Sequence, residues 1–188
     1  MELLREHRLR GFGRLARAIA LVVSGFGGSF LAGQSAGEYE LKAAFLYKFA
    51  SFVEWPSTDV SAPICIGVLG QDPFGATLDE VVKGKTVAGR GFVVRRFRSG
   101  SLPPPCEILF VSSSEKRNLG PILGGLGRDA VLTVGDMPGF CESGGVVGLE
   151  LADSRIRIRI NREAADRAGL QLSSRLLQVA TVVRGRGQ

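Results

Sequence analysis

Apolar residues recur at helical spacing in the stretch EYELKAAFLYKFASFVEWPS, residues 38–57. Four of them share one stripe of a helix: Leu41, Phe45, Phe49 and Phe52. The pattern predicts an amphipathic helix whose phenylalanine stripe faces a core, with Lys42 and Lys48 off that stripe. Pro56 disfavours helical geometry for the residue before it, so we expect the helix to end near Trp55.

Short apolar runs without polar alternation follow, as is typical of strands buried on both faces. They are ICIGVLG (64–70), CEILFVSS (106–113) and AVLTVGD (130–136), with the strand-like GFVVRRF (91–97) among them. Helix signals alternate with these runs. Asp72 as N-cap with Pro73 behind it predicts one helix, and Ser114 opens another that ends at Gly124 and Gly125. This alternation predicts a mostly parallel sheet with helices on both faces.

The pattern changes after residue 136. VVGLEL (146–151) and RIRIRIN (155–161) flank a short turn, which predicts an antiparallel hairpin at an edge of the sheet. Gly169 is expected to end one short helix, and Ser173 or Ser174 to cap the next. The sequence therefore predicts one α/β domain over residues 37–188, with a mostly parallel central sheet, helices on both faces and a C-terminal antiparallel hairpin.

The first 36 residues have the layout of a secretory signal peptide. Five arginines precede an uncharged apolar run over residues 18–33, and small residues follow, so we expect cleavage near residues 33–36. A retained membrane anchor is the alternative. The run is shorter than the roughly 20 apolar residues that a bilayer requires, which favours export.

Removal of this leader changes the chemistry of the chain. The leader carries His7, the only histidine, and it lowers the formal net charge from +6 to +3 when it leaves. A weakly basic domain is a poor candidate for nucleic-acid binding. Without histidine a Ser-His-Asp arrangement cannot form, and a zinc site would need cysteines and carboxylates alone. We therefore assign no catalytic, cofactor-binding or metal-ligating residues and expect a protein that is not an enzyme.

Three cysteines remain in the exported chain. Cys65 and Cys106 lie near the starts of two predicted parallel strands, so neighbouring strands bring them to the same end of the sheet. A disulfide between them is the preferred interpretation in an oxidising compartment, and two packed free thiols are the alternative. Cys141 is then unpaired in a glycine-rich loop. We interpret it as an inert thiol, with a redox role or an intermolecular bond as alternatives.

Several side chains are candidates for contact with another molecule. Arg155, Arg157 and Arg159 alternate with isoleucines, which places three cations on one face of a strand. Charges that discourage sheet pairing are the preferred interpretation, and an acidic partner is the alternative. Trp55 is either a core residue or an exposed anchor, and Phe140 is a further candidate contact. A small anionic ligand at the helix opening of residues 112–115 is a separate alternative.

The order and spacing of six motifs resemble a known family. The motifs are LKAAFLYKFASFVEWP (41–56), ICIGVLGQDPFG (64–75), CEILFVSSSE (106–115), AVLTVGD (130–136), GFCESGG (139–145) and RIRINREAADRAGLQLSSRLLQVA (157–180). Together they cover nearly the whole predicted mature chain, and they resemble the YfiR-like family of periplasmic regulatory proteins.

The resemblance implies an α/β domain in the periplasm, without catalytic activity, that represses a membrane signalling protein. The implied partner is the periplasmic sensor portion of an inner-membrane diguanylate cyclase, which makes cyclic di-GMP. A small-ligand-binding sensory module that works with a sensor kinase or an outer-membrane receptor is the alternative, and a homodimer is a further candidate assembly.

The resemblance also bears on the cysteines. Cys65 and Cys106 match one disulfide position of the family, which agrees with the pairing preferred above. Cys141 matches one half of a second disulfide, but Gly148 stands where its partner is expected. The resemblance therefore implies that only one intramolecular bridge forms in this chain, and it places redox control by a second bridge in doubt.

Overall fold

The computed structural model describes residues 27–56, 61–100, 104, 106–127 and 129–185. The chain divides into two compact units, Met1–Gly37 and Glu38–Gln188, and the fold below is that of the second. The predicted signal peptide lies outside the described residues as far as residue 26, and helix α1 (Gly27–Phe49) begins after it. Among the residues described, no helix is both long and apolar enough to span a membrane.

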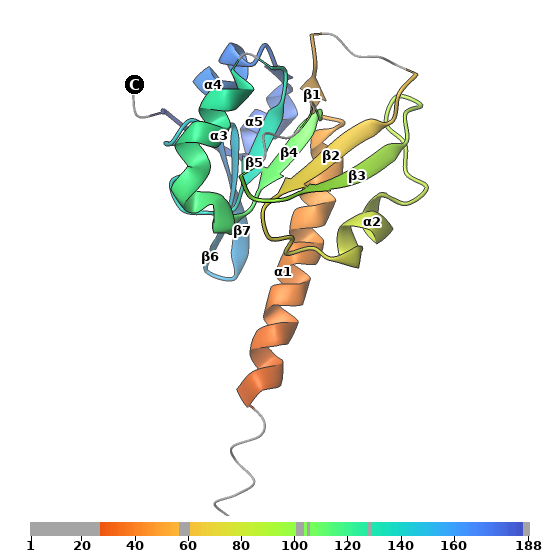
Figure 1. Cartoon of the computed structure of the whole chain (residues 1–188), viewed down its shortest axis with the longest axis vertical. Helices are drawn as coiled ribbons and strands as arrows, with labels where there is room; N and C mark the ends of the chain where they lie inside the picture. The colour runs from red at the N-terminus through yellow and green to blue at the C-terminus, as the bar shows by residue number, and fades with distance from the viewer. Residues whose placement is uncertain (1–26, 57–60, 101–103, 105, 128, 186–188) are drawn as a thin grey trace, which may run out of the picture. The chain divides into compact units, whose positions relative to one another are not determined.

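The described part of the second unit contains a seven-stranded sheet and a two-stranded ribbon (Figure 1). After α1 the elements are β1 (Val53–Glu54), β2 (Ile64–Leu69), α2 (Ala76–Val82), β3 (Phe92–Phe97), β4 (Ile108–Val111), the 3-10 helix η1 (Ser113–Asn118), α3 (Leu119–Leu126), β5 (Leu132–Gly135), β6 (Val147–Ala152), β7 (Arg155–Asn161), α4 (Arg162–Arg167), β8 (Gln171–Leu172), α5 (Ser174–Val179) and β9 (Thr181–Val183).

The sheet has the strand order β3-β2-β4-β5-β6-β7-β9. All neighbouring strands run parallel except β6 and β7, which form the antiparallel hairpin. The separate ribbon pairs β1 with β8 in antiparallel fashion. The predicted α/β class, the mostly parallel sheet and the C-terminal hairpin are therefore confirmed.

Both faces of the central strands are covered, which explains why these strands lack polar alternation. Every residue of β2, β4 and β5 is buried. One face contributes Ile66 and Phe110 to a large core cluster with α1, and the other contributes Leu69 and Leu109 to a smaller cluster with α3. Figure 1 shows the part of α1 from Glu38 onward behind the sheet and α3 in front of it. The prediction of helices on both faces is confirmed.

The buried face of α1 differs from the predicted stripe. Phe49 is buried at 1% exposure, but Leu41 is 47% exposed and Lys42 is only 2% exposed. Phe45 and Phe52 are partly buried against the core. The stripe prediction is therefore wrong at its first position, because Lys42 turns inward to meet a carboxylate that the helix sequence alone does not reveal.

Two helices begin later than their sequence signals. Asp72 accepts a hydrogen bond from the Phe74 backbone amide at 2.8 Å and so shapes a local turn, while α2 itself begins at Ala76. The segment after Ser112 forms η1 first, and α3 continues through the predicted stop at residues 124 and 125. It ends before Gly127, whose φ of 57° lies in the left-handed region that favours glycine.

The hairpin of β6 and β7 turns at Asp153 and Ser154, which both have positive φ, as a two-residue hairpin of the mirror-image type requires. In the strand order, β9 and not the hairpin is the last strand. β9 pairs in parallel with the last residues of β7, from Arg159 to Asn161. The prediction of an edge position is therefore wrong for that half of β7, because the C-terminal segment adds one more strand.

Candidate functional site

The disulfide lies at the end of the sheet where β2 and β4 begin. Cys65 and Cys106 are bonded with an S–S distance of 2.10 Å and a Cα–Cα distance of 4.8 Å. Because β2 and β4 are parallel neighbours, with Ile66 opposite Ile108, the strand starts meet at one end. The preferred pairing from the sequence is therefore present in the structure.

A polar cluster connects this disulfide to Trp55. The Trp55 indole N–H donates to the backbone carbonyl of Glu107 at 3.1 Å. The Glu107 carboxylate accepts from the Cys65 backbone amide at 2.8 Å and forms an ion pair with Arg90. Arg90 also donates from Nε to the Ala62 carbonyl at 2.7 Å. Trp55 is partly buried, so one part of its ring packs on the core and another part reaches the surface.

Sequence reasoning missed Arg90 and Glu107 as members of this cluster. The available signal was the position of Glu107 directly after Cys106 at the start of a buried strand. A carboxylate at such a position needs partners, since burial of an unpaired charge is costly. The ion pair between Arg90 and Glu107 compensates both charges within the fold.

A second polar cluster forms where α1 passes the end of β5. Lys42 donates to Asp136 Oδ2 at 2.8 Å and also pairs with Glu38, and the Tyr39 hydroxyl donates to the same Asp136 oxygen at 2.9 Å. Burial, followed by the negative charge of Asp136, raises the pKa of Tyr39 above its ordinary value. Asp136 Oδ1 is buried and has no hydrogen-bond partner among the described residues. The cluster anchors α1 by an ion pair between distant parts of the chain.

The three arginines of β7 have different surroundings. Arg155 is exposed and makes no ion pair among the residues described, and Arg157 pairs on the surface with Asp153. Arg159 pairs with both Glu150 and Glu142. Its charge is therefore already compensated within the fold. Of the three candidates, Arg155 and Arg157 are exposed, and Arg159 is partly buried.

Phe140 does not reach the surface. Its side chain is 0% exposed and packs in the smaller core cluster under α3. A Cβ built on Gly135 would lie only 2.5 Å from the Phe140 ring, and Gly145 approaches the ring in the same way. Gly135 at the end of β5 and Gly145 therefore make room for the ring. This corrects the expectation that Phe140 contacts a partner, since no partner can reach it in this conformation.

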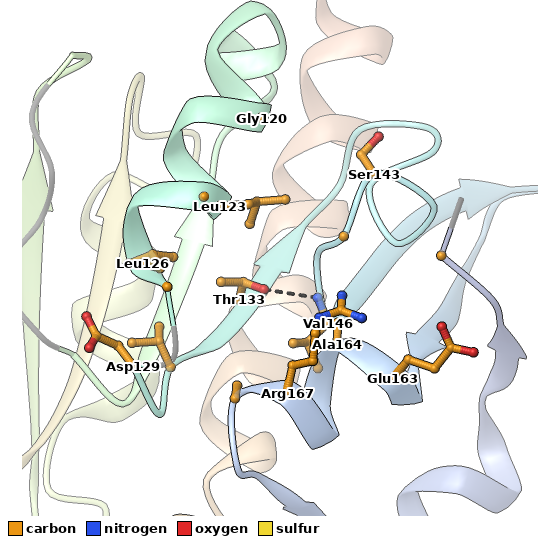
Figure 2. A pocket seen from close by; sticks show the side chains of 16 residues that line it. Gly120, Leu123, Leu126, Asp129, Thr133, Ser143, Val146, Glu163, Ala164 and Arg167 are labelled. Atoms are coloured by element: carbon orange, nitrogen blue, oxygen red, sulfur yellow. Dashed lines mark hydrogen bonds between the residues drawn. The ribbon is translucent and has the colours of Figure 1, made fainter. Parts of the chain in front are cut away.

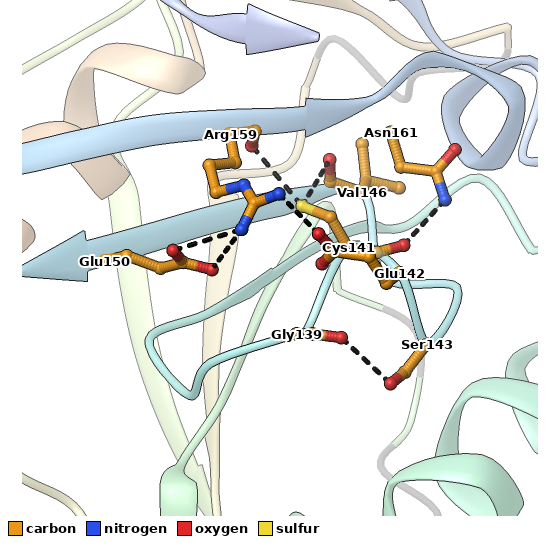
Figure 3. A network of polar contacts seen from close by, with 8 residues as sticks. All are labelled: Gly139, Cys141, Glu142, Ser143, Val146, Glu150, Arg159 and Asn161. Carbon is orange, nitrogen blue, oxygen red and sulfur yellow. Dashed lines mark hydrogen bonds and ion pairs between the residues drawn. The ribbon is translucent and has the colours of Figure 1, made fainter. Parts of the chain in front are cut away.

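Cys141 is a buried free thiol beside the ion pairs of Arg159 (Figure 3). The thiol contacts the Arg159 and Val146 carbonyl oxygens at 3.4 and 3.7 Å. Burial, followed by the charge of Glu142, raises the pKa of the Cys141 thiol to about 12. The Asn161 side chain fixes the same loop by donation to the Cys141 carbonyl at 2.8 Å. Because the thiolate is the reactive form, this environment keeps Cys141 unreactive at neutral pH.

The helix opening at residues 112–115 does not favour an anion. Glu115 is 1% exposed, and its carboxylate accepts hydrogen bonds from the Ser99 hydroxyl at 3.0 Å and from Asn118 at 3.3 Å. Gly70 lies so close that an added Cβ would meet Ser114 Oγ at 2.5 Å. A second negative group would therefore find a buried carboxylate and little space.

The chain was also compared with known proteins. No curated protein matches it. A family model described as YfiR/HmsC-like matches residues 39–181, which is most of the chain and includes the disulfide, Trp55, Lys42, Asp136 and Cys141. Within the described residues, no group of three or more histidines, cysteines and carboxylates is placed to hold a metal ion. The match runs from Tyr39 in α1 to Thr181, the first residue of β9, and the chain belongs to the YfiR/HmsC-like family.

Proposed function

We propose that this protein is exported to the periplasm, loses its leader near residues 33–36, and there represses a diguanylate cyclase of the inner membrane by binding the periplasmic sensor portion of that enzyme. The observation that carries the proposal is membership in the YfiR/HmsC-like family over residues 39–181. The Cys65–Cys106 disulfide supports export, because structural disulfides persist mainly in oxidising compartments.

The protein acts in this proposal by binding and not by catalysis. No histidine follows residue 7. The buried titratable side chains that the structure describes at the two polar clusters are paired with one another, as Arg90 is with Glu107 and Lys42 with Asp136. The thiol of Cys141 is held in its neutral form by burial. An active site requires groups that can exchange protons or attack a substrate, whereas these groups are paired or buried in their neutral form. Their surroundings therefore support a role in binding.

The proposed partner surface has two parts, which are taken as separate candidates. The first is the edge around Trp55, where a partly buried indole is held by the Glu107 carbonyl. Tryptophan held in one orientation contributes strongly to small interfaces. The second is the hairpin, where Arg155 and Arg157 are exposed. Their charges suit an acidic surface on the partner and would affect the rate of association most.

Repression requires that the protein bind two states of its partner unequally. A 100-fold preference for the inactive state corresponds to about 2.7 kcal/mol. That difference is within the range of one interfacial tryptophan. A modest rearrangement at the Trp55 edge is therefore sufficient to relieve repression.

The experiment is deletion of the gene in its native host, followed by measurement of cyclic di-GMP by mass spectrometry. Deletion is expected to raise cyclic di-GMP several-fold, and the full-length chain is expected to restore the original level. A chain that starts at residue 37, without the leader, should fail to restore it. An unchanged cyclic di-GMP level after deletion would refute the cyclase as partner, and full rescue by the leaderless chain would refute export.

The Trp55 contact is tested in the same strain by two variants whose folding is checked by circular dichroism. Trp55→Ala removes the ring, while Trp55→Phe keeps an aromatic ring and loses the N–H that donates to Glu107. Loss of repression by the alanine variant, with most repression kept by phenylalanine, is the expected result. Full repression by a folded Trp55→Ala variant would exclude the anchor role.

A further inference from the structure

A groove lies between α3 and α4, away from both polar clusters. Its volume is about 490 Å³, within the roughly 300–1,000 Å³ range of small-molecule sites. Thr133 and Val146 lie on its floor, and Leu123 and Leu126 of α3 supply apolar side chains (Figure 2). α4 contributes Ala164 and Arg167 on the opposite wall, and Ala168 follows directly after the helix.

The groove is open because the α3 wall carries glycines. Gly120, Gly124 and Gly127 line it, and a Cβ built on any of them would meet no atom within 4 Å. Glycine inside a helix destabilises it relative to alanine. Neither close packing nor, at Gly120 and Gly124, a positive φ accounts for glycine at these positions. The glycines leave a trough in which the apolar side chains of α3 stand beside polar groups, since Asp129, Ser143 and Glu163 also line the groove.

Two hydrogen-bond donors in the groove are unused. Thr133 is 5% exposed, and its hydroxyl accepts from the Val146 backbone amide at 3.0 Å but donates to no group among the described residues. Arg167 is exposed and makes no ion pair within the described chain. Figure 2 shows its guanidinium extending toward the middle of the groove, whereas the Glu163 carboxylate points away.

We propose that this groove binds a small carboxylic acid with an apolar body. The Arg167 guanidinium receives the carboxylate, since planar donors on arginine match carboxylate oxygens. The Thr133 hydroxyl donates to the ligand at the floor, and the apolar body lies against Leu123 and Val146. The site is independent of the proposed partner surfaces, so its failure would leave the proposed function intact.

The test uses the purified chain from residue 37 and 3-phenylpropionate as the probe, titrated by calorimetry. The neutral 3-phenylpropan-1-ol, which has the same apolar body, is the matched ligand. The chain is first checked for cooperative unfolding, and the full-length protein replaces it if that check fails. We expect the acid to bind with a dissociation constant of about 1 mM or tighter, and the alcohol to bind at least about tenfold more weakly.

Three variants assign the binding to the groove. A Cβ at Gly124 would meet no atom within 4 Å, so Gly124→Leu directs a larger side chain into open space; it should abolish binding and leave the melting temperature unchanged or higher. Arg167→Gln should weaken binding of the acid at least about tenfold and leave the alcohol unaffected. Arg162→Gln, on the same helix but outside the groove, is the matched control and should bind like the parent.

Each remaining outcome overturns the proposal. No binding of the acid at millimolar concentration excludes the ligand class, and equal binding of acid and alcohol excludes the role of Arg167. Undiminished binding by Gly124→Leu would place the ligand elsewhere on the protein. Equal losses of affinity for the acid in Arg162→Gln and Arg167→Gln would show that the overall surface charge, and not a contact with Arg167, attracts the acid.

Discussion

Gly148→Cys is expected to create a second disulfide, with Cys141. A Cβ built on Gly148 lies 3.3 Å from the Cys141 sulfur, and its other near neighbours are the Arg159 Cβ at 3.6 Å and a Glu150 oxygen at 4.0 Å. In a disulfide, each Cβ lies about 3 Å from the sulfur of the other cysteine. The backbone of Gly148 does not have the positive φ that would strain a side chain. The site is therefore close to bonding geometry before any rearrangement.

The expected gain follows from the short loop that the new bond closes. A loop of about eight residues gives about 2.5 kcal/mol in the chain-entropy estimate. Two weak contacts of the thiol, to the Val146 and Arg159 carbonyl oxygens, weaken when the sulfur is bonded. We therefore expect a net stabilisation of about 1 to 2.5 kcal/mol under oxidising conditions.

The assay combines intact mass under non-reducing conditions with urea unfolding, with and without reductant. The bridged protein should be lighter by two hydrogen atoms than the same variant with both thiols free, and it should unfold at a higher urea concentration. Gly148→Ser introduces a side chain of similar size without a bond, and the double variant Cys141→Ala, Gly148→Cys removes the partner thiol. The reasoning fails if both thiols stay free after oxidation, or if the bridged protein is no more stable than Gly148→Ser.

Three further predictions follow from the clusters. Lys42→Met leaves the Asp136 carboxylate buried without its cation and should lower the free energy of unfolding, measured in urea, by about 3 to 5 kcal/mol. Lys48→Met, at an exposed position, is the control and should change it little. A loss below about 1 kcal/mol for Lys42→Met would contradict the buried ion pair. Reduction of the Cys65–Cys106 disulfide in the folded protein should shift the fluorescence emission of Trp55, the only tryptophan, because the indole N–H donates to the carbonyl of Glu107, the residue after Cys106. An unchanged spectrum would show that the disulfide does not influence the surroundings of Trp55. Burial raises the pKa of the Cys141 thiol from 9.0 to about 12. The stability that the neutral thiol contributes is therefore complete below pH 9 and is lost as the pH rises through 12. Cys141→Ala should reduce this loss of stability at alkaline pH.

The sequence was sufficient to predict the class of fold because burial on both faces leaves a direct trace in the residues. The runs 64–70, 106–113 and 130–136 became β2, β4 and β5, which are wholly buried. The disulfide was predictable for the same reason, since two buried parallel strands place their first residues at one end. Local patterns and simple topology carry this information without knowledge of distant contacts.

The errors arose where a distant partner decides the outcome. The helix pattern predicts Lys42 outside the core because it assigns lysine to water, but the partner of Lys42, Asp136, lies 94 residues away. Strand β9 was not expected because Thr181–Val183 is short and its form depends on pairing with β7. The sequence names Phe140 as a candidate partner contact, whereas in the structure its ring fills the space beside Gly135 and Gly145. None of these contacts has a local signature.

The Cys65–Cys106 disulfide and the free thiol of Cys141 predict different effects of a reducing environment on the two candidate partner surfaces. The Cys65–Cys106 bond closes a separation of 41 residues, and its loss removes about 4 kcal/mol in the chain-entropy estimate. The Trp55 indole is held by the residue that follows Cys106, so the effect of reduction begins at one proposed partner edge. Cys141 is already a thiol and stays buried, so reduction leaves the β6–β7 hairpin unchanged. A partner held at Trp55 would therefore be released by reduction, whereas one held by Arg155 on the hairpin would be retained until the domain unfolds.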